Sequence, residues 1–187
     1  LVDFHRWAKN FGVVDPDWSE LDLEEEVRLV RPGVLSELDY QSSLQYIQAA
    51  YDDADTRLLM SFLLLLTYRF GLRSSEASGL LSRDWCQYQE LRWVLVRNNK
   101  IRKLKTESSQ RAIPLLFELS ALEEKLVEQV LTRYQALAGN DKKHPIFCEL
   151  KNGKIKSHSQ IQIFPSAIIK VIRAVTGSTD LVLHHCR

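Results

Sequence analysis

Residues 56–76 read TRLLMSFLLLLTYRFGLRSSE, an apolar stretch that ends in Gly-Leu-Arg and a short polar run. Large apolar residues cover most of its circumference when it is drawn as a helix, so we expect residues 56–70 to form a helix in the protein core. These residues are Leu58, Leu59, Phe62, Leu63, Leu65 and Leu66. Gly71 favours the end of a helix, and residues 72–81 predict a further helix. Arg73 is therefore expected at a junction between two helices.

The sequence before this stretch contains a domain boundary. Apolar side chains at helical spacing near the start are followed by Asp15-Pro16, and Pro16 disfavours helix at the residue before it. We therefore expect residues 1–18 to be the end of a preceding domain with its linker. Residues 19–187 are then a second domain.

Three further segments of the second domain predict helices. Ser36, with Asp39 three residues later, forms an approximate capping box for a helix that runs to about Tyr51. Helical periodicity returns over residues 119–137, and residues 166–175 follow the same pattern.

Between these helices the apolar period becomes alternating. Residues 91–96, 100–104 and 111–115 alternate in this way, and we expect them to form a three-stranded antiparallel sheet. Residues 107–110 are then the turn between the last two strands, which places Lys105 at the tip of a hairpin. Residues 145–148 are a short apolar segment, and Lys151, Lys154 and Lys156 are expected to lie in a basic loop. The predicted fold class is α+β, mainly α-helical, with one small antiparallel sheet.

The composition is that of a globular protein, with 45% hydrophobic residues in 187. The three cysteines are odd in number and far apart, which argues against disulfides and favours a reducing cytoplasm. The longest apolar run, residues 58–66, is too short to cross a bilayer, and no signal-like start is visible. We therefore expect no membrane segment.

The net charge of +1 hides a gradient along the chain. Residues 1–60 carry 5 Lys/Arg against 13 Asp/Glu, a net charge of −8, whereas residues 61–187 carry 20 against 11, a net charge of +9. The densest basic run, residues 97–111, holds Arg97, Lys100, Arg102, Lys103, Lys105 and Arg111. Such a run attracts phosphate with an affinity that falls with salt. The alternative is a solvated sheet edge whose cations prevent aggregation.

Three motifs occur in a fixed order: residues 68–76 (YRFGLRSSE), residues 104–115 (LKTESSQRAIPL) and residues 183–187 (LHHCR), the last after Thr176-Gly177. Together they resemble the first arginine box, the hairpin lysine motif and the His-x-x-Arg box of the tyrosine recombinases, the phage integrase family. The resemblance implies the fold of the DNA breaking-rejoining enzymes, with residues 19–187 as a catalytic domain that is incomplete at its carboxyl end. It also implies site-specific DNA recombination or integration, as carried out for mobile elements.

The chemistry implied by the resemblance is phosphoryl transfer on duplex DNA without a metal or another cofactor. A tyrosine attacks a backbone phosphate, the 5′-hydroxyl leaves, and a 3′-phosphotyrosine link forms. Guanidinium groups stabilise the charge on the non-bridging oxygens, a role that fits Arg73 and Arg187. Lys105 is the candidate general acid, because neighbouring cations lower the pKa of an ammonium group. His184, three residues before Arg187, would orient the phosphate and accept a proton.

Other residues are expected to support this site. Glu76 lies three residues after Arg73 on the same helical face, where its carboxylate would hold the guanidinium in position; an ordinary helix ion pair is the alternative. The cations expected to contact DNA are Lys100, Arg102, Lys103 and Arg111.

The family's nucleophilic tyrosine lies beyond its His-x-x-Arg box, and this sequence has no tyrosine there. Its six tyrosines, at positions 40, 46, 51, 68, 88 and 134, all precede the box, so none is assigned as the nucleophile. We expect residues 1–187 to bind DNA without cleaving it unless a partner supplies the tyrosine. Recombinases of this type work as homotetramers on paired DNA sites; this chain alone is expected to be monomeric.

The same residues allow other interpretations. A metal site at His184, His185 and Cys186 is disfavoured, because adjacent helical residues point in different directions and no second Cys/His cluster supplies further ligands. A non-catalytic DNA-binding relative stays open, as does a helical interaction domain with accidental motif matches. Type IB topoisomerases use similar chemistry, but the Gly-Leu-Arg box and the short chain look closer to the integrases.

Overall fold

The computed structural model describes residues 34–104, 106, 109–141, 144–151, 154–157, 163–181 and 183, which all belong to one compact unit. The predicted domain boundary at residues 18–19 lies outside this part of the chain. The helices are α2 (Glu37–Ala50), α3 (Ala54–Arg69), α4 (Ser74–Ser78), α5 (Ala121–Ala138) and α6 (Ile163–Thr176), with the 3-10 turn η2 (Ser82–Asp84). The strands are β1 (Trp85–Tyr88), β2 (Leu91–Val96), β3 (Arg111–Pro114), β4 (Cys148–Lys151) and β5 (Lys154–Ser157).

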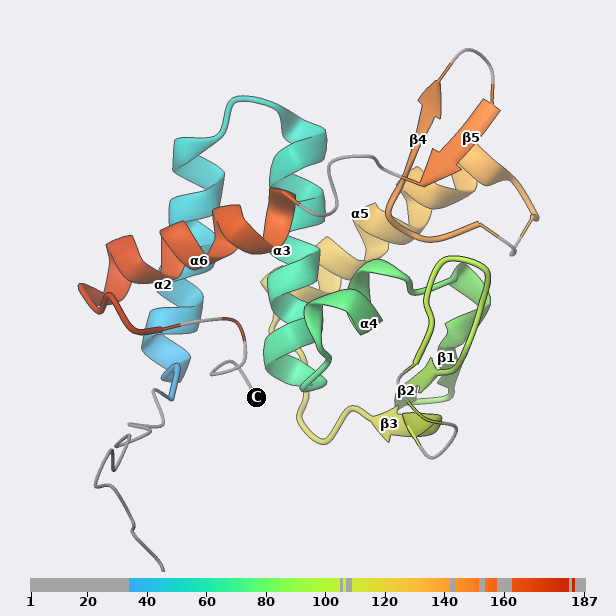
Figure 1. The fold of residues 1–187 in the computed structure, drawn as a ribbon, viewed down its shortest axis with the longest axis horizontal. Coiled ribbons are helices and arrows are strands. Elements are labelled where there is room, and N and C mark those ends of the chain that lie inside the picture. The colour runs from blue at the N-terminus through green and yellow to red at the C-terminus, as the bar shows by residue number, and fades with distance from the viewer. Residues whose placement is uncertain are drawn as a thin grey trace, which may run out of the picture. The chain divides into compact units, whose positions relative to one another are not determined.

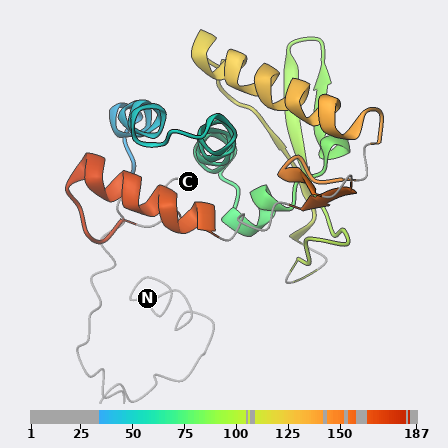
Figure 2. The same ribbon diagram turned by 90° about the horizontal axis from the view of Figure 1, so that it is seen from above.

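Helix α3 is the centre of the helical part. It packs against α2, α4, α5 and α6, and its residues from Leu59 to Thr67 are all buried. Figure 1 shows α6 crossing α2 and α3, and Figure 2 looks along α2 and α3 with α6 on one side of the pair and α5 on the other. The all-round apolar pattern of this segment therefore predicted a core helix correctly.

The helix starts follow the polar residues that precede them. Ser36 and Asp39 form the predicted capping box of α2, and the Asp53 carboxylate accepts the Thr56 N–H at the start of α3. The prediction for α4 was too long: the helix ends at Ser78, five residues after Arg73. Beyond it Leu80 and Leu81 turn into the core and are buried.

The predicted three-stranded antiparallel sheet is confirmed, but one of its strands was misassigned. The strand order is β1-β2-β3, with Trp85 opposite Val94 and Val96 opposite Arg111. Residues 100–104, which were predicted as a strand, are instead part of the connection between β2 and β3. The first strand is β1, which the sequence analysis did not identify.

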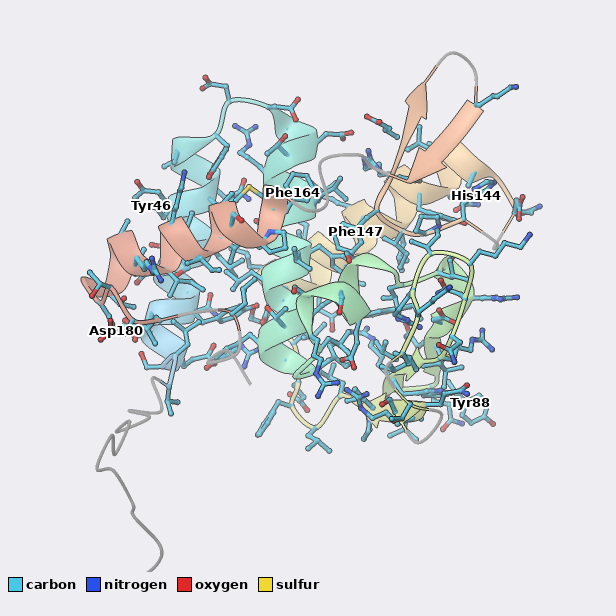
Figure 3. The ribbon with its side chains drawn as sticks, in the orientation of Figure 1. Tyr46, Tyr88, His144, Phe147, Phe164 and Asp180 are labelled. Carbon is cyan, nitrogen blue, oxygen red and sulfur yellow. The ribbon has the colours of Figure 1, made fainter. Side chains whose placement is uncertain are left out.

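A second, two-stranded sheet replaces the basic loop predicted at residues 151–156. Strands β4 and β5 pair antiparallel, with Lys151 opposite Lys154. Just before β4, Phe147 is fully buried with its ring 5.9 Å from that of Phe62. Figure 3 shows Phe147 and Phe164 in the interior, whereas Tyr88 lies at the edge.

The mainly helical α+β class is confirmed by this architecture. None of the described helices combines the length and the apolar character needed to cross a membrane.

Candidate active site

Arg73 stands on a short bend that links α3 to α4. Gly71 has φ +60°, in the left-handed region, and turns the chain sharply after α3. Leu72 follows with its side chain 1% exposed in the core. Arg73 is then the extended N-cap residue of α4, and its side chain is 52% exposed. The buried Leu72 therefore fixes the backbone while the guanidinium of the next residue faces solvent, and Arg73 lies at the predicted junction between two helices.

Glu76 connects Arg73 to the sheet. Its carboxylate is 2% exposed, accepts the Arg73 backbone N–H at 2.9 Å and lies 3.7 Å from the Arg73 guanidinium. The guanidinium of Arg111, on β3, donates to both of its oxygens, at 3.1 and 2.9 Å. Burial alone would raise the pKa of the Glu76 carboxyl. The hydrogen bonds from Arg111 and from the Arg73 N–H lower it by more, so the pKa of Glu76 lies below its usual value. We call these three residues the Glu76 clamp.

The Arg102 side chain is enclosed within the protein. It is 1% exposed, and its guanidinium donates to the carbonyl oxygens of Glu76 at 2.7 Å and Arg97 at 2.7 Å. A Cβ atom on Gly79 would lie 2.6 Å from the Cβ of Arg102, so only glycine leaves room for this side chain. The expectation that Arg102 reaches DNA does not fit a guanidinium enclosed in this way.

The connection between β2 and β3 is held by asparagine side chains. Asn99 Oδ1 accepts the backbone N–H groups of Ile101 and Arg102, at 2.8 and 2.7 Å. Asn98 Oδ1 accepts the Leu104 N–H at 2.7 Å. These bonds replace strand pairing for this segment. Sequence analysis missed both asparagines, although Asn-Asn before a basic run is a typical loop signal.

Asp84 is a second buried anion beneath the same connection. It is 0% exposed and accepts the Arg97 guanidinium at 2.6 Å and the Leu81 N–H at 3.2 Å. Lys100 and Lys103, by contrast, are exposed and form no ion pair with another described residue. The described part of the basic run therefore divides into arginines paired with buried carboxylates and two exposed lysines, Lys100 and Lys103.

Lys105 lies outside the described residues, but both of its flanks are placed. Leu104 is partly buried against the core. Thr106 and Ser109 form a turn, with a backbone hydrogen bond of 3.1 Å and their hydroxyls 2.8 Å apart. The predicted lysine thus belongs to the connection that leads into Arg111 and the Glu76 clamp.

His184, His185, Cys186 and Arg187 also lie outside the described residues. The chain that leads to them is placed: α6 ends before Gly177, which has φ +68°. Leu181 and Leu183 are then buried, 7% and 6% exposed, in the core that also contains Leu72. The metal site that the sequence analysis disfavoured falls on these residues and is not described. Among the residues that are described, no cluster of three or more His, Cys, Asp and Glu side chains could hold a metal.

Three predicted site residues each come directly after a leucine, and the three leucines lie in or against the same core. Arg73 follows Leu72, Lys105 follows Leu104, and His184 follows Leu183. Leu72 and Leu183 belong to the core cluster, and Leu104 packs against it. Segments far apart in the sequence are thereby anchored in the same interior.

Three of the six tyrosines have hydroxyl groups that donate within the protein, among them Tyr68, which donates to the Glu37 carboxylate at 3.2 Å. Tyr40 is buried and donates to Glu123 at 2.8 Å, and the hydroxyl of Tyr134 donates to the Asp141 carbonyl. Burial raises the pKa of Tyr40 and of Tyr134, that of Tyr134 to about 12. Neither side chain is prepared to act as a nucleophile.

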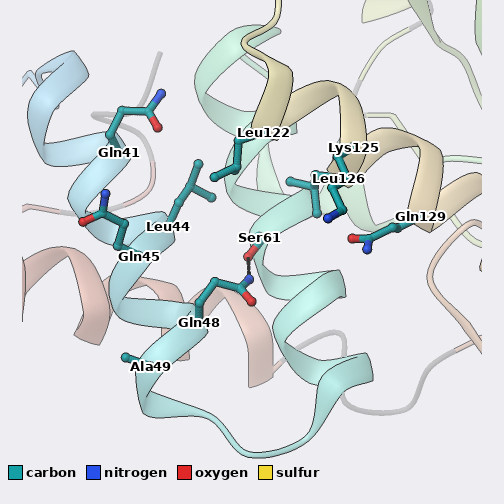
Figure 4. Close-up of a pocket in the computed structure, with 10 residues that line it drawn as sticks. All are labelled: Gln41, Leu44, Gln45, Gln48, Ala49, Ser61, Leu122, Lys125, Leu126 and Gln129. Carbon is teal, nitrogen blue, oxygen red and sulfur yellow. Dashed lines mark hydrogen bonds between the residues drawn. The ribbon is translucent and has the colours of Figure 1, made fainter.

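A hollow of about 600 Å³ between α2, α3 and α5 contains none of the predicted site residues. Figure 4 shows glutamine amides along it and a hydrogen bond from Gln48 to Ser61. It is lined by Gln41, Leu44, Gln45, Gln48, Ala49, Ser61, Leu122, Lys125, Leu126 and Gln129. With one cation among neutral amides, this hollow is poorly suited to a phosphate.

Comparison with solved structures shows that the described residues have the fold of the tyrosine recombinase catalytic domain. Two of the matched structures are the XerH site-specific recombinase, in a post-cleavage complex with a palindromic difH substrate and in a pre-cleavage complex with difH. The first is 18% identical, with a TM-score of 0.57 over 83% of this chain and 39% of that chain. The second is 20% identical, with a TM-score of 0.55 over 82% and 41%. The XerA recombinase is 15% identical, with a TM-score of 0.54 over 90% and 53%.

The resemblance seen in the three motifs is therefore confirmed at the level of the fold. This chain spans 39% to 53% of the lengths of the matched recombinases. No family model matches the sequence. No curated protein matches it either.

Proposed function

We propose that this chain forms much of the catalytic domain of a tyrosine recombinase, which breaks and rejoins strands of duplex DNA at specific sites. The observation that supports this most directly is the placement of Arg73. Arg73 directly follows a core leucine, and its half-exposed guanidinium lies 3.7 Å from the buried Glu76 carboxylate, so it can meet a phosphate with little rearrangement.

Each site residue has a role in this proposal. Arg73 and Arg187 donate to the non-bridging oxygens of the scissile phosphate and stabilise the charge that develops there. Lys105 gives a proton to the leaving 5′-hydroxyl, and His184 orients the phosphate and accepts the proton of the attacking tyrosine. Glu76 is a positioning residue, because it contacts Arg73 and Arg111 and is itself buried.

The attacking tyrosine is not among the six tyrosines of this chain in our proposal. Residues 1–187 alone bind duplex DNA without cleaving it, and the complete protein forms the 3′-phosphotyrosine link. The complete protein acts on cytoplasmic DNA as a homotetramer on paired sites, whereas residues 1–187 alone are monomeric.

The test is covalent attachment by the complete protein. DNA from around its own coding region is incubated with the protein, and adducts that resist denaturing detergent are counted. Arg73→Ala and Arg187→Ala should each abolish the adduct, while Lys170→Ala, which removes an exposed cation of α6, should leave it unchanged. Adducts that persist in the arginine variants would refute these roles.

Two further outcomes separate the remaining alternatives. If the unaltered protein binds duplex DNA with a steep salt dependence but forms no adduct, it is a non-catalytic DNA-binding relative. If it does not bind duplex DNA even at low salt, it is a helical interaction domain, and the motif matches are accidental.

A further inference from the structure

A small hollow with cations at its rim lies beside the connection between β2 and β3. It measures about 350 Å³ and is lined by Leu81, Arg83, Asn99, Lys100 and Ile101. Arg83 and Lys100 are both exposed. Neither forms an ion pair with another described residue, whereas Arg97, Arg102 and Arg111 all pair with buried carboxylates. Two cations that have no ion pair among the described residues thus line one hollow.

The rim that carries Lys100 is held in place from below. Asn99 accepts two backbone N–H groups of the loop and donates from Nδ2 to the Gly79 carbonyl at 2.9 Å. Arg102, two residues after Lys100, is enclosed between the sheet and α4. Arg83 belongs to η2, where the adjacent Asp84 is buried and paired with Arg97. Both cations therefore project from backbone that is fixed by buried polar contacts, which lowers the cost of ordering them around an anion.

The lining combines two kinds of chemistry. Leu81 and Ile101 supply an aliphatic surface, and Ile101 is 46% exposed. Arg83 and Lys100 supply positive charge, and Arg83 also has the planar donor geometry that matches phosphate oxygens. A ligand with an apolar ring next to a negative group fits this lining, and the deoxyribose-phosphate unit of a DNA backbone has that composition.

We propose that Arg83 and Lys100 hold a phosphate of the DNA backbone, with the adjoining deoxyribose against Ile101. This inference rests on the proposed function for its choice of DNA as the ligand. The site is formed by residues other than the Glu76 clamp, so it takes a phosphate other than the one that Arg73 faces. Its function is to position the duplex, and it carries no sequence information by itself.

The experiment measures binding of residues 1–187 to a fluorescent duplex over a range of salt concentrations. The double variant Arg83→Gln/Lys100→Gln should lower the slope of log affinity against log salt by about 0.9, the change expected when one phosphate is no longer neutralised. Arg83→Lys should keep most of the slope, because the charge stays. Lys170→Gln, which removes a cation on α6 outside the hollow, is the control and should leave the slope unchanged. Circular dichroism checks that each variant is folded.

The outcomes separate this inference from the proposed function. If the unaltered chain binds the duplex and the double variant keeps the full slope, the inference is wrong and the proposed function stands. If the unaltered chain does not bind duplex DNA at low salt, both fail. In a final measurement, the unaltered chain and the double variant are titrated with inorganic phosphate alone. Phosphate binding that the double substitution abolishes, together with an unchanged DNA slope, would make the hollow a site for free anions and overturn the DNA assignment.

Discussion

Gly71 fixes the direction in which Arg73 leaves the core. Its φ of +60° is unfavourable for residues with a Cβ, but a Cβ built there would meet no atom within 4 Å. The effect of a substitution should therefore come from the backbone angle and not from crowding. We predict that Gly71→Ala lowers the free energy of unfolding by about 1–2 kcal/mol.

Gly71→Asn separates the two causes, because asparagine tolerates the left-handed region better than alanine does. It should recover much of the stability lost by Gly71→Ala, although its side chain is larger. Urea unfolding of both variants measures this. A greater loss with asparagine than with alanine would show that space is limiting after all.

Glu76 should make stability depend on pH. Its pKa in the folded state lies below the ordinary value of 4.5, so the unfolded chain binds a proton more readily than the folded one. The stabilisation by its carboxylate is therefore complete above about pH 4.5 and is lost as the pH falls through the folded-state pKa. We predict that Glu76→Gln lowers the free energy of unfolding by about 2 kcal/mol at pH 7, and that this difference shrinks below pH 4.5.

Denaturant unfolding at several pH values tests the clamp. Glu128→Gln, which neutralises an exposed glutamate on α5, serves as the control and should change stability by less than about 0.5 kcal/mol. A Glu76→Gln deficit that stays constant from pH 7 to pH 3 would mean that its charge has no part in the clamp.

At the scale of elements, one carboxylate connects three helices. Glu123, in the first turn of α5, is 0% exposed and accepts hydrogen bonds from the Tyr40 hydroxyl of α2 and from Arg69 of α3, at 2.8 and 2.6 Å. The Arg69 guanidinium also lies over the ring of Tyr40, 5.0 Å from its centre, and pairs with Glu37. Arg69 precedes Arg73 by four residues, so this cluster fixes the end of α3 from which the candidate site projects.

Removing Glu123 should be costly because the buried Tyr40 hydroxyl would lose its acceptor and the largely enclosed Arg69 would keep only the half-exposed Glu37 as a partner. We predict that Glu123→Ala lowers the free energy of unfolding by about 3–5 kcal/mol. The neighbouring Glu124 pairs with Arg92 but is 43% exposed, so Glu124→Ala should cost no more than about 1 kcal/mol. Equal losses in the two variants, measured by chemical denaturation, would contradict the central role of Glu123.

The elements that sequence analysis predicted well are those with local signals. Helices α2 and α3 have side-chain caps and regular apolar spacing, which depend on nearby residues alone. Strand β1 was missed because its turn to β2, Gln89-Glu90, lacks the glycine or asparagine that marks most two-residue hairpins, although Gln89 has φ +53°.

Two other elements were misassigned for different reasons. Residues 100–104 alternate like a strand, but asparagine side chains take up their backbone N–H groups. The β4–β5 pair had a clear signal that was overlooked: Asn152-Gly153 stands between the paired residues Lys151 and Lys154.

In the candidate site, the sequence indicates candidate residues but does not indicate what each of them contacts. Arg73 and Glu76 follow from a motif on one short helix. The pairing of Arg111 with Glu76 and the enclosure of Arg102 depend on contacts across 35 and 26 residues, which no local pattern contains. Paired and unpaired cations look alike in a sequence, because the difference lies in the carboxylates that tertiary structure brings to them.

For the whole molecule, three leucines that precede proposed site residues connect the proposed site to the core. Leu72, Leu104 and Leu183 lie in or against one interior although they are more than a hundred residues apart at the extremes. In a close-packed interior a cavity shifts nearby groups by fractions of an ångström. Cleavage depends on such alignment, whereas phosphate contacts by exposed lysines depend on it much less.

This difference predicts that a core substitution can separate binding from cleavage. Leu72→Ala and Leu64→Ala both remove a fully enclosed leucine of the same core, and each should cost about 2–5 kcal/mol of stability. Only Leu72 adjoins Arg73, so Leu72→Ala in the complete protein should reduce covalent attachment by about a hundredfold at a temperature where both variants are folded. Duplex binding at low salt should stay close to that of the unaltered protein in both. If attachment falls equally in the two variants after correction for the folded fraction, the leucine supports stability alone and Arg73 is positioned by the Glu76 clamp.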